Sequence, residues 1–369
     1  METAREAALR LYYETDARIQ NKLPATTHKF ADVARHAIAR METEIREGVG
    51  KQAYRDYVQT LNNWLITYFG GTDIAKLDLA AVTRFDAWRP QQSGKLPAQS
   101  IINNHNSALN SVLNLAELNG WPVKPLRPTL LNNGVKTQSR GSFSVEEYRV
   151  IYTALRSYHK QTTNEKSAAT RETLRNYVLF LANTGVRHGT EALGLTWRNI
   201  EWCAGEGEGE GERYLAVSVD GKTNKRTAVA RDRVVNSLWR QTQLNPRIEA
   251  MDFDTLIAAK SDEPVFTTRL CATVTVHNLN LAFNALLDEL NLKAGANGRT
   301  RALYNWRHFY ATQDLARGVS THALSRQLGN NTEMIDVVSA NTSHCLMLNC
   351  TVGGSRNIDE TPVIQNCTV

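Results

Sequence analysis

The stretch that most constrains the fold spans residues 174–202, where two helices are expected on either side of a tight turn. Its first part carries apolar residues at the spacing of one buried helical face. Gly185 fits the end of this helix, where a positive φ is often needed. Arg187 follows on the turn, and Glu191 on the second helix is expected to brace it. Arg187 is either a solvated loop arginine or a fixed guanidinium, whose paired donors would match a phosphate.

Length and charge limit the class of protein. A chain of 369 residues suits two domains, and a net charge of +6 suits a polyanionic partner. No apolar run approaches the roughly 18 residues that a membrane span needs, and the charged N-terminus lacks a signal-peptide core. We therefore expect a cytoplasmic protein with no membrane contact. The cysteines form no C-x-x-C pair, so no metal or small-molecule cofactor is expected.

The first half of the chain predicts a helical domain and a linker. Residues 1–26 read as a polar, partly helical leader, and residues 27–120 show four stretches of helical periodicity. Residues 121–142 break the pattern with three prolines and two glycines. This linker would be a solvated tether or would lie along the phosphates of a polyanion. Its charged residues, all basic, are Lys124, Arg127, Lys136 and Arg140.

A second domain is expected over residues 143–336, mainly helical with a small antiparallel β-sheet. Ser144 and Glu147 predict a capping box at its first helix. Alternating residues from Tyr214 to Ala230 predict a β-hairpin with basic residues at its tip. Further helices are expected over residues 232–260, 276–292, 303–317 and 320–329. The inner face of the 276–292 helix would comprise Leu279, Leu281, Phe283, Leu286, Leu287 and Leu290.

Two strings resemble the arginine boxes of the tyrosine recombinases, the phage-integrase family. The string TGVRHGTEALGLTW, which contains Arg187, resembles the first box, although Glu191 follows Arg187 by four residues where many members have three. Residues 301–336 resemble the second box, with Arg307 and His308 followed by Ala-Thr at the expected spacing. The usual histidine before this arginine is replaced by a tyrosine, and the later L-G-H motif ends in an asparagine.

The resemblance implies a pocket for a scissile DNA phosphate. Two arginines would neutralise the phosphate in the transition state, and a hairpin lysine would protonate the leaving 5′ oxygen. Lys222 matches that lysine best and Lys225 is the runner-up, while a solvated hairpin tip is the alternative. The implied catalytic residues are Arg187, Lys222, Arg307, Tyr304 and Asn330. Contacts to double-stranded DNA are expected from Lys124, Arg127, Lys136, Arg140, Lys225 and His308.

The family's attacking tyrosine has no counterpart here. The last tyrosine is Tyr310, and the aberrant tail at residues 337–369 contains no Tyr, Phe, Trp or Lys. One explanation is a frameshift, because the degenerate code permits the integrase-like string KYxxLLNAELHSGR in a shifted frame over residues 340–354. Ser339 as a replacement nucleophile is disfavoured, since a serine hydroxyl has a much higher pKa than the roughly 10 of tyrosine. A tyrosine supplied in trans is disfavoured too.

The resemblance implies an N-terminal helical core-binding (SAM-like) domain and a C-terminal α+β catalytic domain that clamp duplex DNA. The expected function is site-specific recombination through a phosphotyrosine intermediate, by a homotetramer from a prophage or other mobile element, impaired here by the missing nucleophile. A non-cleaving DNA-binding relative is the alternative that the missing tyrosine favours, so enzyme and binding module both stay open. A helical protein-interaction scaffold, without salt-dependent DNA binding, is a further alternative.

Overall fold

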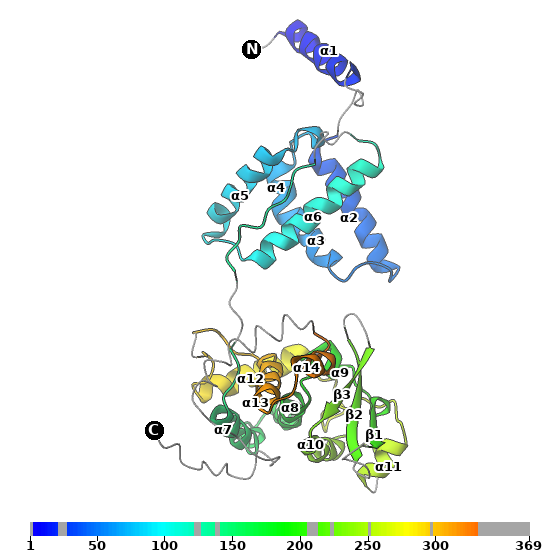
Figure 1. Cartoon of the computed structure of the whole chain (residues 1–369), viewed down its shortest axis with the longest axis vertical. Coiled ribbons are helices and arrows are strands. Elements are labelled where there is room, and N and C mark those ends of the chain that lie inside the picture. Colours follow the sequence, from blue (N-terminus) through cyan, green and yellow to red (C-terminus); the bar gives the residue numbers. More distant parts are fainter. Residues whose placement is uncertain are drawn as a thin grey trace. The chain divides into compact units, whose positions relative to one another are not determined.

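The computed structural model describes residues 3–20, 28–121, 127–136, 141–204, 213–221, 225–249, 252–295 and 298–330 (Figure 1). The chain divides into two compact units, Met1–Gln138 and Ser139–Val369, and each is described by itself. Within the described residues, no helix is both long and apolar enough to cross a membrane.

The first unit is helical throughout its described part. Its elements are α1 Ala4–Gln20, α2 Phe30–Arg46, α3 Tyr54–Thr60, a π turn Leu61–Leu65, α4 Ile66–Phe69, a 3-10 turn Ile74–Lys76, α5 Leu79–Ser93 and α6 Gln99–Leu118. Apolar residues at helical spacing on α2 to α6 bury a common core, which includes Phe30, Phe69, Phe85 and Val112. The four stretches of helical periodicity thus pack together in one bundle.

The described part of the 121–142 segment is not a solvated tether. The guanidinium of Arg127 donates to the side-chain oxygens of Asn110 and Asn114 on α6, at 2.7 and 2.6 Å. Asn132 donates to the main-chain oxygen of Gln99 at 2.9 Å, and Val135 pairs with the backbone just before α6. The segment packs back because its backbone polar groups find partners along α6 and at its start.

The second unit is built around one buried helix. Its helices are α7 Val145–Leu155, α8 Glu165–Thr184, α9 Thr190–Leu193, α10 Arg233–Thr242, α11 Phe253–Ala258, α12 Val276–Glu289, α13 Asn305–Ala316 and α14 Thr321–Leu328, with 3-10 turns at Tyr158–Gln161 and Trp197–Asn199. Helices α7, α10, α12 and α13 contact α8, and nearly every residue in the last half of α8 is buried. Because the last half of α8 is buried, the position at which the chain leaves this helix, at Gly185, is fixed.

A three-stranded antiparallel sheet lies beside these helices in the order β1-β2-β3. The strands are β1 Ile200–Ala204, β2 Arg213–Asp220 and β3 Lys225–Ala230. The pairing of Asp220 with Lys225 closes the described part of the expected hairpin, and Lys222 lies outside the described residues. The fold class is therefore as predicted: mainly helical with a small antiparallel sheet.

Local signals place several element ends correctly. The capping box of Ser144 and Glu147 is confirmed, with both hydrogen bonds formed. Gly185 ends α8 in the left-handed region at φ +66°, and Ser320 caps α14. The helix after the turn is shorter than the apolar pattern suggested, because α9 ends at Leu193.

Two expectations are wrong. Residues 232–260 are not one helix, since α10 ends at Thr242 and α11 begins at Phe253. Pro246 lacks an amide donor, and the side chain of Asp252 starts the second helix by accepting from the amide of Thr255 at 2.7 Å. Leu281 is not on the inner face of α12: its side chain is 57% exposed.

Candidate functional site

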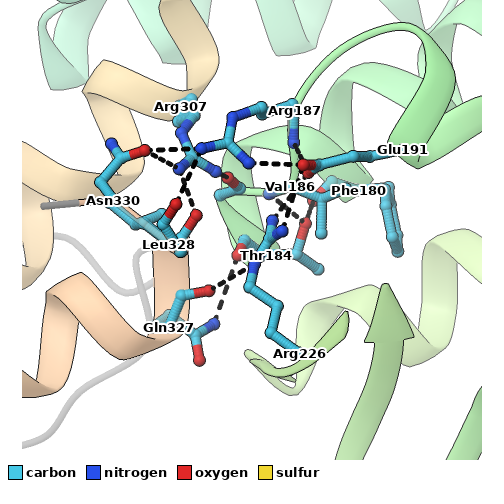
Figure 2. A network of polar contacts seen from close by, with 12 residues as sticks. Phe180, Thr184, Val186, Arg187, Glu191, Arg226, Arg307, Gln327, Leu328 and Asn330 are labelled. Carbon is cyan, nitrogen blue, oxygen red and sulfur yellow. Dashed lines mark hydrogen bonds and ion pairs between the residues drawn. The ribbon is translucent and has the colours of Figure 1, made fainter. Parts of the chain in front are cut away.

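Three arginines from separate elements converge at the end of α8 (Figure 2). Arg187 comes from the turn after α8, Arg226 from β3 and Arg307 from the first turn of α13. The carboxylate of Glu191, on α9, and the side-chain oxygen of Asn330, just after α14, lie between them. The candidate site consists of these three arginines and the two residues that they contact, Glu191 and Asn330.

The end of α8 has to be a glycine. A Cβ on Gly185 would lie 2.5 Å from Cδ2 of Leu328 and 2.6 Å from Cδ1 of Tyr310, and the backbone there has a positive φ. Close approach of α13 and α14 to this glycine lets its carbonyl oxygen accept from Nη1 of Arg307 at 2.7 Å. The chain then turns directly to Arg187.

Arg307 is the buried arginine of the site, with 2% of its surface exposed. Besides Gly185, its guanidinium donates to the carbonyl oxygen of Leu328 and to Oδ1 of Asn330, the latter at 2.8 Å. Burial, followed by the nearby charge of Arg187, lowers the pKa of Arg307 to about 9. The oxygens that accept these hydrogen bonds from Arg307 are all neutral, so none of these contacts pairs its charge with a carboxylate.

Glu191 is buried between two of the arginines. Nη1 of Arg187 donates to Oε1 at 2.5 Å, and the amide of the same residue donates to Oε2 at 3.0 Å. Arg226 donates to both carboxylate oxygens, at 3.1 and 2.7 Å. Burial by itself raises the pKa of a carboxyl, but the hydrogen bonds from Arg226 and Arg187 outweigh it and lower the pKa of Glu191 to about 2. Glu191 therefore stays ionised and holds the turn.

The side-chain oxygen of Asn330 joins Arg187 to Arg307. Nη2 of Arg187 donates to this oxygen at 2.7 Å, and Nη2 of Arg307 donates to it at 2.8 Å. The amide orientation follows from chemistry, because two guanidinium donors require an acceptor and not an NH₂ group. One oxygen atom thus sits between two guanidinium groups.

The electrostatic balance of the cluster is positive. Three guanidinium groups and one carboxylate, Glu191, leave a net charge of two positive units. The side chain of Arg187 is 26% exposed, so the cluster opens to solvent on that side. An oxyanion could reach Arg187 there and replace the amide oxygen of Asn330 as the shared acceptor.

Tyr304 and His308 lie at the start of α13, one turn apart. Their rings stand edge to face with centroids 5.5 Å apart, and both residues are partly buried. Tyr304 lies close enough to Arg307 to affect its pKa. Tyr304 therefore borders the arginine cluster, and His308 packs against Tyr304.

The other predicted residues lie in β3, in the first unit or outside the described residues. Lys225 is exposed at the first position of β3, and its side chain is on the face opposite to that of Arg226. Arg127 and Lys136 belong to the first unit, where Arg127 is held against α6. The remaining predicted residues, Lys222, Lys124 and Arg140, lie outside the described residues, as do Ser339 and the 337–369 tail.

Arg226 was missed by sequence reasoning. Its neighbours in the hairpin are basic, so it looked like part of a solvated tip. The alternation of β3 could have found it, because Arg226 shares a strand face with Ala228 and Ala230, which are buried. A long cation on the buried face of a strand needs a partner, and Glu191 is that partner.

Two buried aromatic hydroxyls next to the site are structural. The hydroxyl of Tyr177 lies 2.8 Å from Nδ1 of His188 and accepts from the amide of Gly189 at 3.2 Å, which fixes the turn after Arg187. Burial lowers the pKa of His188 to about 4, so this imidazole is neutral at neutral pH. Tyr310 is 5% exposed, and burial raises its pKa. A tyrosine inside the core cannot reach a phosphate, which excludes Tyr310 as nucleophile.

Solved structures share this arrangement of helices and sheet. The Tn1549 transposon integrase, solved with circular intermediate DNA, has a TM-score of 0.56 at 16% identity and covers 86% of this chain and 99% of its own. The XerH site-specific recombinase, bound to a palindromic difH substrate in a post-cleavage complex, has a TM-score of 0.58 at 14% identity and covers 91% of each chain. A lambda integrase dimer bound to a COC' core site has a TM-score of 0.54 at 14% identity and covers 82% of this chain and 94% of its own.

No family model and no curated protein sequence matches this chain. At these low identities the similarity is one of backbone arrangement, and the three similar structures are all recombinases or integrases. The chain therefore has the fold of the tyrosine recombinases.

Proposed function

We propose that this chain is a site-specific DNA recombinase of the integrase type, whose Arg187 and Arg307 bind the scissile phosphate. The observation that carries the proposal is the shared oxygen of Asn330, which accepts from both guanidinium groups at 2.7 and 2.8 Å. A non-bridging phosphate oxygen has the same acceptor character and adds a negative charge, so it would replace this oxygen in the pocket.

The residues around the two arginines support phosphoryl transfer without a metal. As a hydroxyl oxygen attacks phosphorus, it gives up its proton to water, one phosphorus–oxygen bond forms and the bond to the 5′ oxygen breaks, while charge builds on the non-bridging oxygens. Arg187 and Arg307 would neutralise that charge, and Tyr304 and His308 would flank the phosphate. The departing 5′ oxygen would take a proton from Lys222.

The partner in this proposal is double-stranded DNA. The similar structures include a transposon integrase and recombinases in complex with DNA, which supports a mobile element or prophage as the source. The first unit would act as the core-binding domain, with Lys124 and Lys136 on the DNA backbone, and Arg140 of the second unit would contact that backbone as well. Arg127 would assist from its position on α6. Strand exchange would take place in a homotetramer.

A non-cleaving DNA-binding relative is a second candidate. One observation favours it: the last tyrosine of the chain is Tyr310, which is buried in α13. Such a protein would use the same arginines to hold a phosphate without forming a phosphotyrosine bond. The gene's nucleotide sequence after codon 336 bears on this choice, because an in-frame tyrosine-containing continuation there would identify a frameshift.

The test is DNA binding and covalent capture with the full chain. Duplexes that the protein selects from a random pool serve as the DNA, and binding is measured at several salt concentrations. The proteins compared are the natural chain, Arg187→Met and the control Arg198→Met. Arg198 is an exposed surface residue paired with Asp262. We expect Arg187→Met to weaken binding about tenfold or more and Arg198→Met to leave it unchanged. Equal binding by all three proteins contradicts the proposal.

A nicked version of the selected duplex then separates the two candidates. A protein–DNA adduct that survives denaturation identifies a cleaving recombinase, because only a covalent phosphodiester intermediate traps the protein. Salt-dependent binding with no adduct identifies the non-cleaving relative. A chain with no salt-dependent binding to any duplex is neither.

A further inference from the structure

Arg226 is the arginine of the cluster to which the resemblance assigned no role. Its Nη1 and Nη2 donate to the two carboxylate oxygens of Glu191, and its Nε donates to the main-chain oxygen of Gln327 at 3.2 Å. The side chain therefore links β3 to α9 and to the end of α14 (Figure 2). Only 9% of it is exposed.

The path of the Arg226 side chain depends on a glycine. A Cβ at Gly329 would lie 2.9 Å from Cδ and 3.3 Å from Nε of Arg226. Gly329 also has φ +61°, and its carbonyl oxygen accepts from Nη2 of Arg187 at 2.9 Å. The same glycine therefore makes room for one arginine and binds the other.

A separate contact fixes the strand on which Arg226 stands. The side-chain amide of Gln327 accepts from the amide of Val229 at 2.9 Å and donates to the carbonyl oxygen of Val229 at 2.8 Å. It thus pairs with the edge of β3 as a neighbouring strand would. These two hydrogen bonds hold β3 against α14 and so fix the backbone position from which the side chain of Arg226 extends to Glu191.

The contacts have a consequence for charge. Glu191 carries one negative charge and has two arginine partners, Arg187 and Arg226. With Arg226 in place, the carboxylate is neutralised by a residue that lies almost entirely inside the protein. Without it, Glu191 would pair with Arg187 alone and cancel the charge that faces solvent.

We propose that Arg226 is a positioning residue that neutralises Glu191 and so leaves the charge of Arg187 available to a bound tetrahedral oxyanion, such as a phosphodiester. This inference rests on the proposed function, because it assumes that Arg187 and Arg307 bind such an anion. It extends that function by giving the hairpin strand β3 a direct part in setting the anion affinity of the pocket.

The test is calorimetric titration of the full chain with sulfate, which keeps its two charges from neutral to mildly acidic pH. The variants are Arg226→Met, Glu191→Gln and the double variant. Arg231→Met is the matched control, since Arg231, the residue directly after β3, also pairs with a mostly buried carboxylate, that of Asp314 and not that of Glu191. The variants Arg187→Met and Arg307→Met report whether sulfate occupies the proposed pocket.

We expect Arg226→Met to bind sulfate more weakly, by about tenfold or more, at neutral pH, because the cluster loses one unit of positive charge near a doubly charged anion. The double variant restores the net charge of the cluster and should bind about as well as the natural chain. Arg231→Met should bind as the natural chain does. If the role of Arg226 were purely structural, removing the charge of Glu191 would not restore the sulfate affinity that Arg226→Met loses.

The pH profile gives an independent readout. The charged and titratable groups around Glu191 are Arg187 on the turn, Arg226 on β3 and Arg307 on α13, with Tyr304 beside Arg307. In the natural chain Glu191 stays ionised down to a pKa of about 2, so Glu191 itself should cause no change in sulfate affinity between about pH 7 and about pH 4. In Arg226→Met the carboxyl loses both hydrogen bonds from Arg226, its pKa rises, and sulfate affinity should recover as the pH falls.

Three results decide between the possibilities. Unchanged sulfate affinity in Arg226→Met overturns the inference. Weak binding in Arg226→Met that neither Glu191→Gln nor acid restores also overturns it, because the role is then structural. Sulfate binding that Arg187→Met and Arg307→Met leave unchanged overturns the proposed function itself, and with it this inference.

Discussion

The guanidinium groups of Arg187 and Arg307 donate hydrogen bonds to the same oxygen atom, Oδ1 of Asn330. The two arginines lie far apart in the sequence of the second unit, one after α8 and the other in α13. They meet because α8 ends at Gly185, against which α13 and α14 pack closely. A shared acceptor between two cations is the geometry that a phosphate oxygen would use.

The two arginines should differ in their effect on stability. Arg307 is buried, and its loss leaves the carbonyl oxygens of Gly185 and Leu328 without their donor. We expect Arg307→Met to lower the free energy of unfolding by about 3 kcal/mol. Arg187 is partly exposed, and Arg187→Met should cost no more than about 1 kcal/mol. Urea unfolding followed by circular dichroism measures both, and equal losses would contradict the assignment.

A substitution at the end of α8 should be among the most damaging in the second unit. Gly185→Ala adds a Cβ within 2.6 Å of Leu328 and Tyr310 at a positive φ, and we expect a loss of about 3 kcal/mol or more in unfolding free energy. Gly94→Ala is the matched control, because Gly94 has the same φ of +66° with nothing within 4 Å. The control should cost only about 1 kcal/mol, from backbone strain alone.

Glu191 should make part of the stability sensitive to acid. Its pKa is lowered from 4.5 to about 2, so its contribution is fully present above the unfolded value of about 4.5 and is lost as the pH falls through about 2. The shift of about 2.5 units corresponds to at most about 3 kcal/mol. Unfolding free energies measured across this window should fall less steeply for Glu191→Gln than for the natural chain, and identical slopes would show that Glu191 does not contribute.

Asn330 offers a test of the shared acceptor itself. Asn330→Asp places a permanent negative charge between Arg187 and Arg307, so we expect a more stable fold and loss of DNA and sulfate binding. Asn330→Ala removes the internal acceptor and should retain anion binding. The two variants are compared by thermal unfolding and by sulfate titration, and tight sulfate binding by Asn330→Asp would place the anion elsewhere.

The sequence correctly predicted those helix ends that are set by residues within the same helical turn. Ser144 and Gly185 act within one turn of their own helices, so the capping box and the end of α8 were readable from neighbouring residues. Arg187 and Arg307 were found through motif strings, and only the folded chain shows that one oxygen of Asn330 joins them.

What sequence reasoning missed depends on tertiary contacts. Arg226 looked like a solvated hairpin residue until Glu191 was seen opposite it. The strand β1, with five residues, has too short a pattern to stand out, and its pairing with β2 makes it a strand. Leu281 fitted an apolar run, but within the described part of the chain its side chain is largely exposed. The break between α10 and α11 was signalled by Pro246 and was overlooked.

The central claim is that Arg187 and Arg307 hold one oxyanion, and a crystal structure of the full chain grown with sulfate tests it most directly. We expect a sulfate oxygen within about 3 Å of both guanidinium groups, in place of the side-chain oxygen of Asn330. Sulfate bound elsewhere, with Asn330 still between the two arginines, would contradict the account.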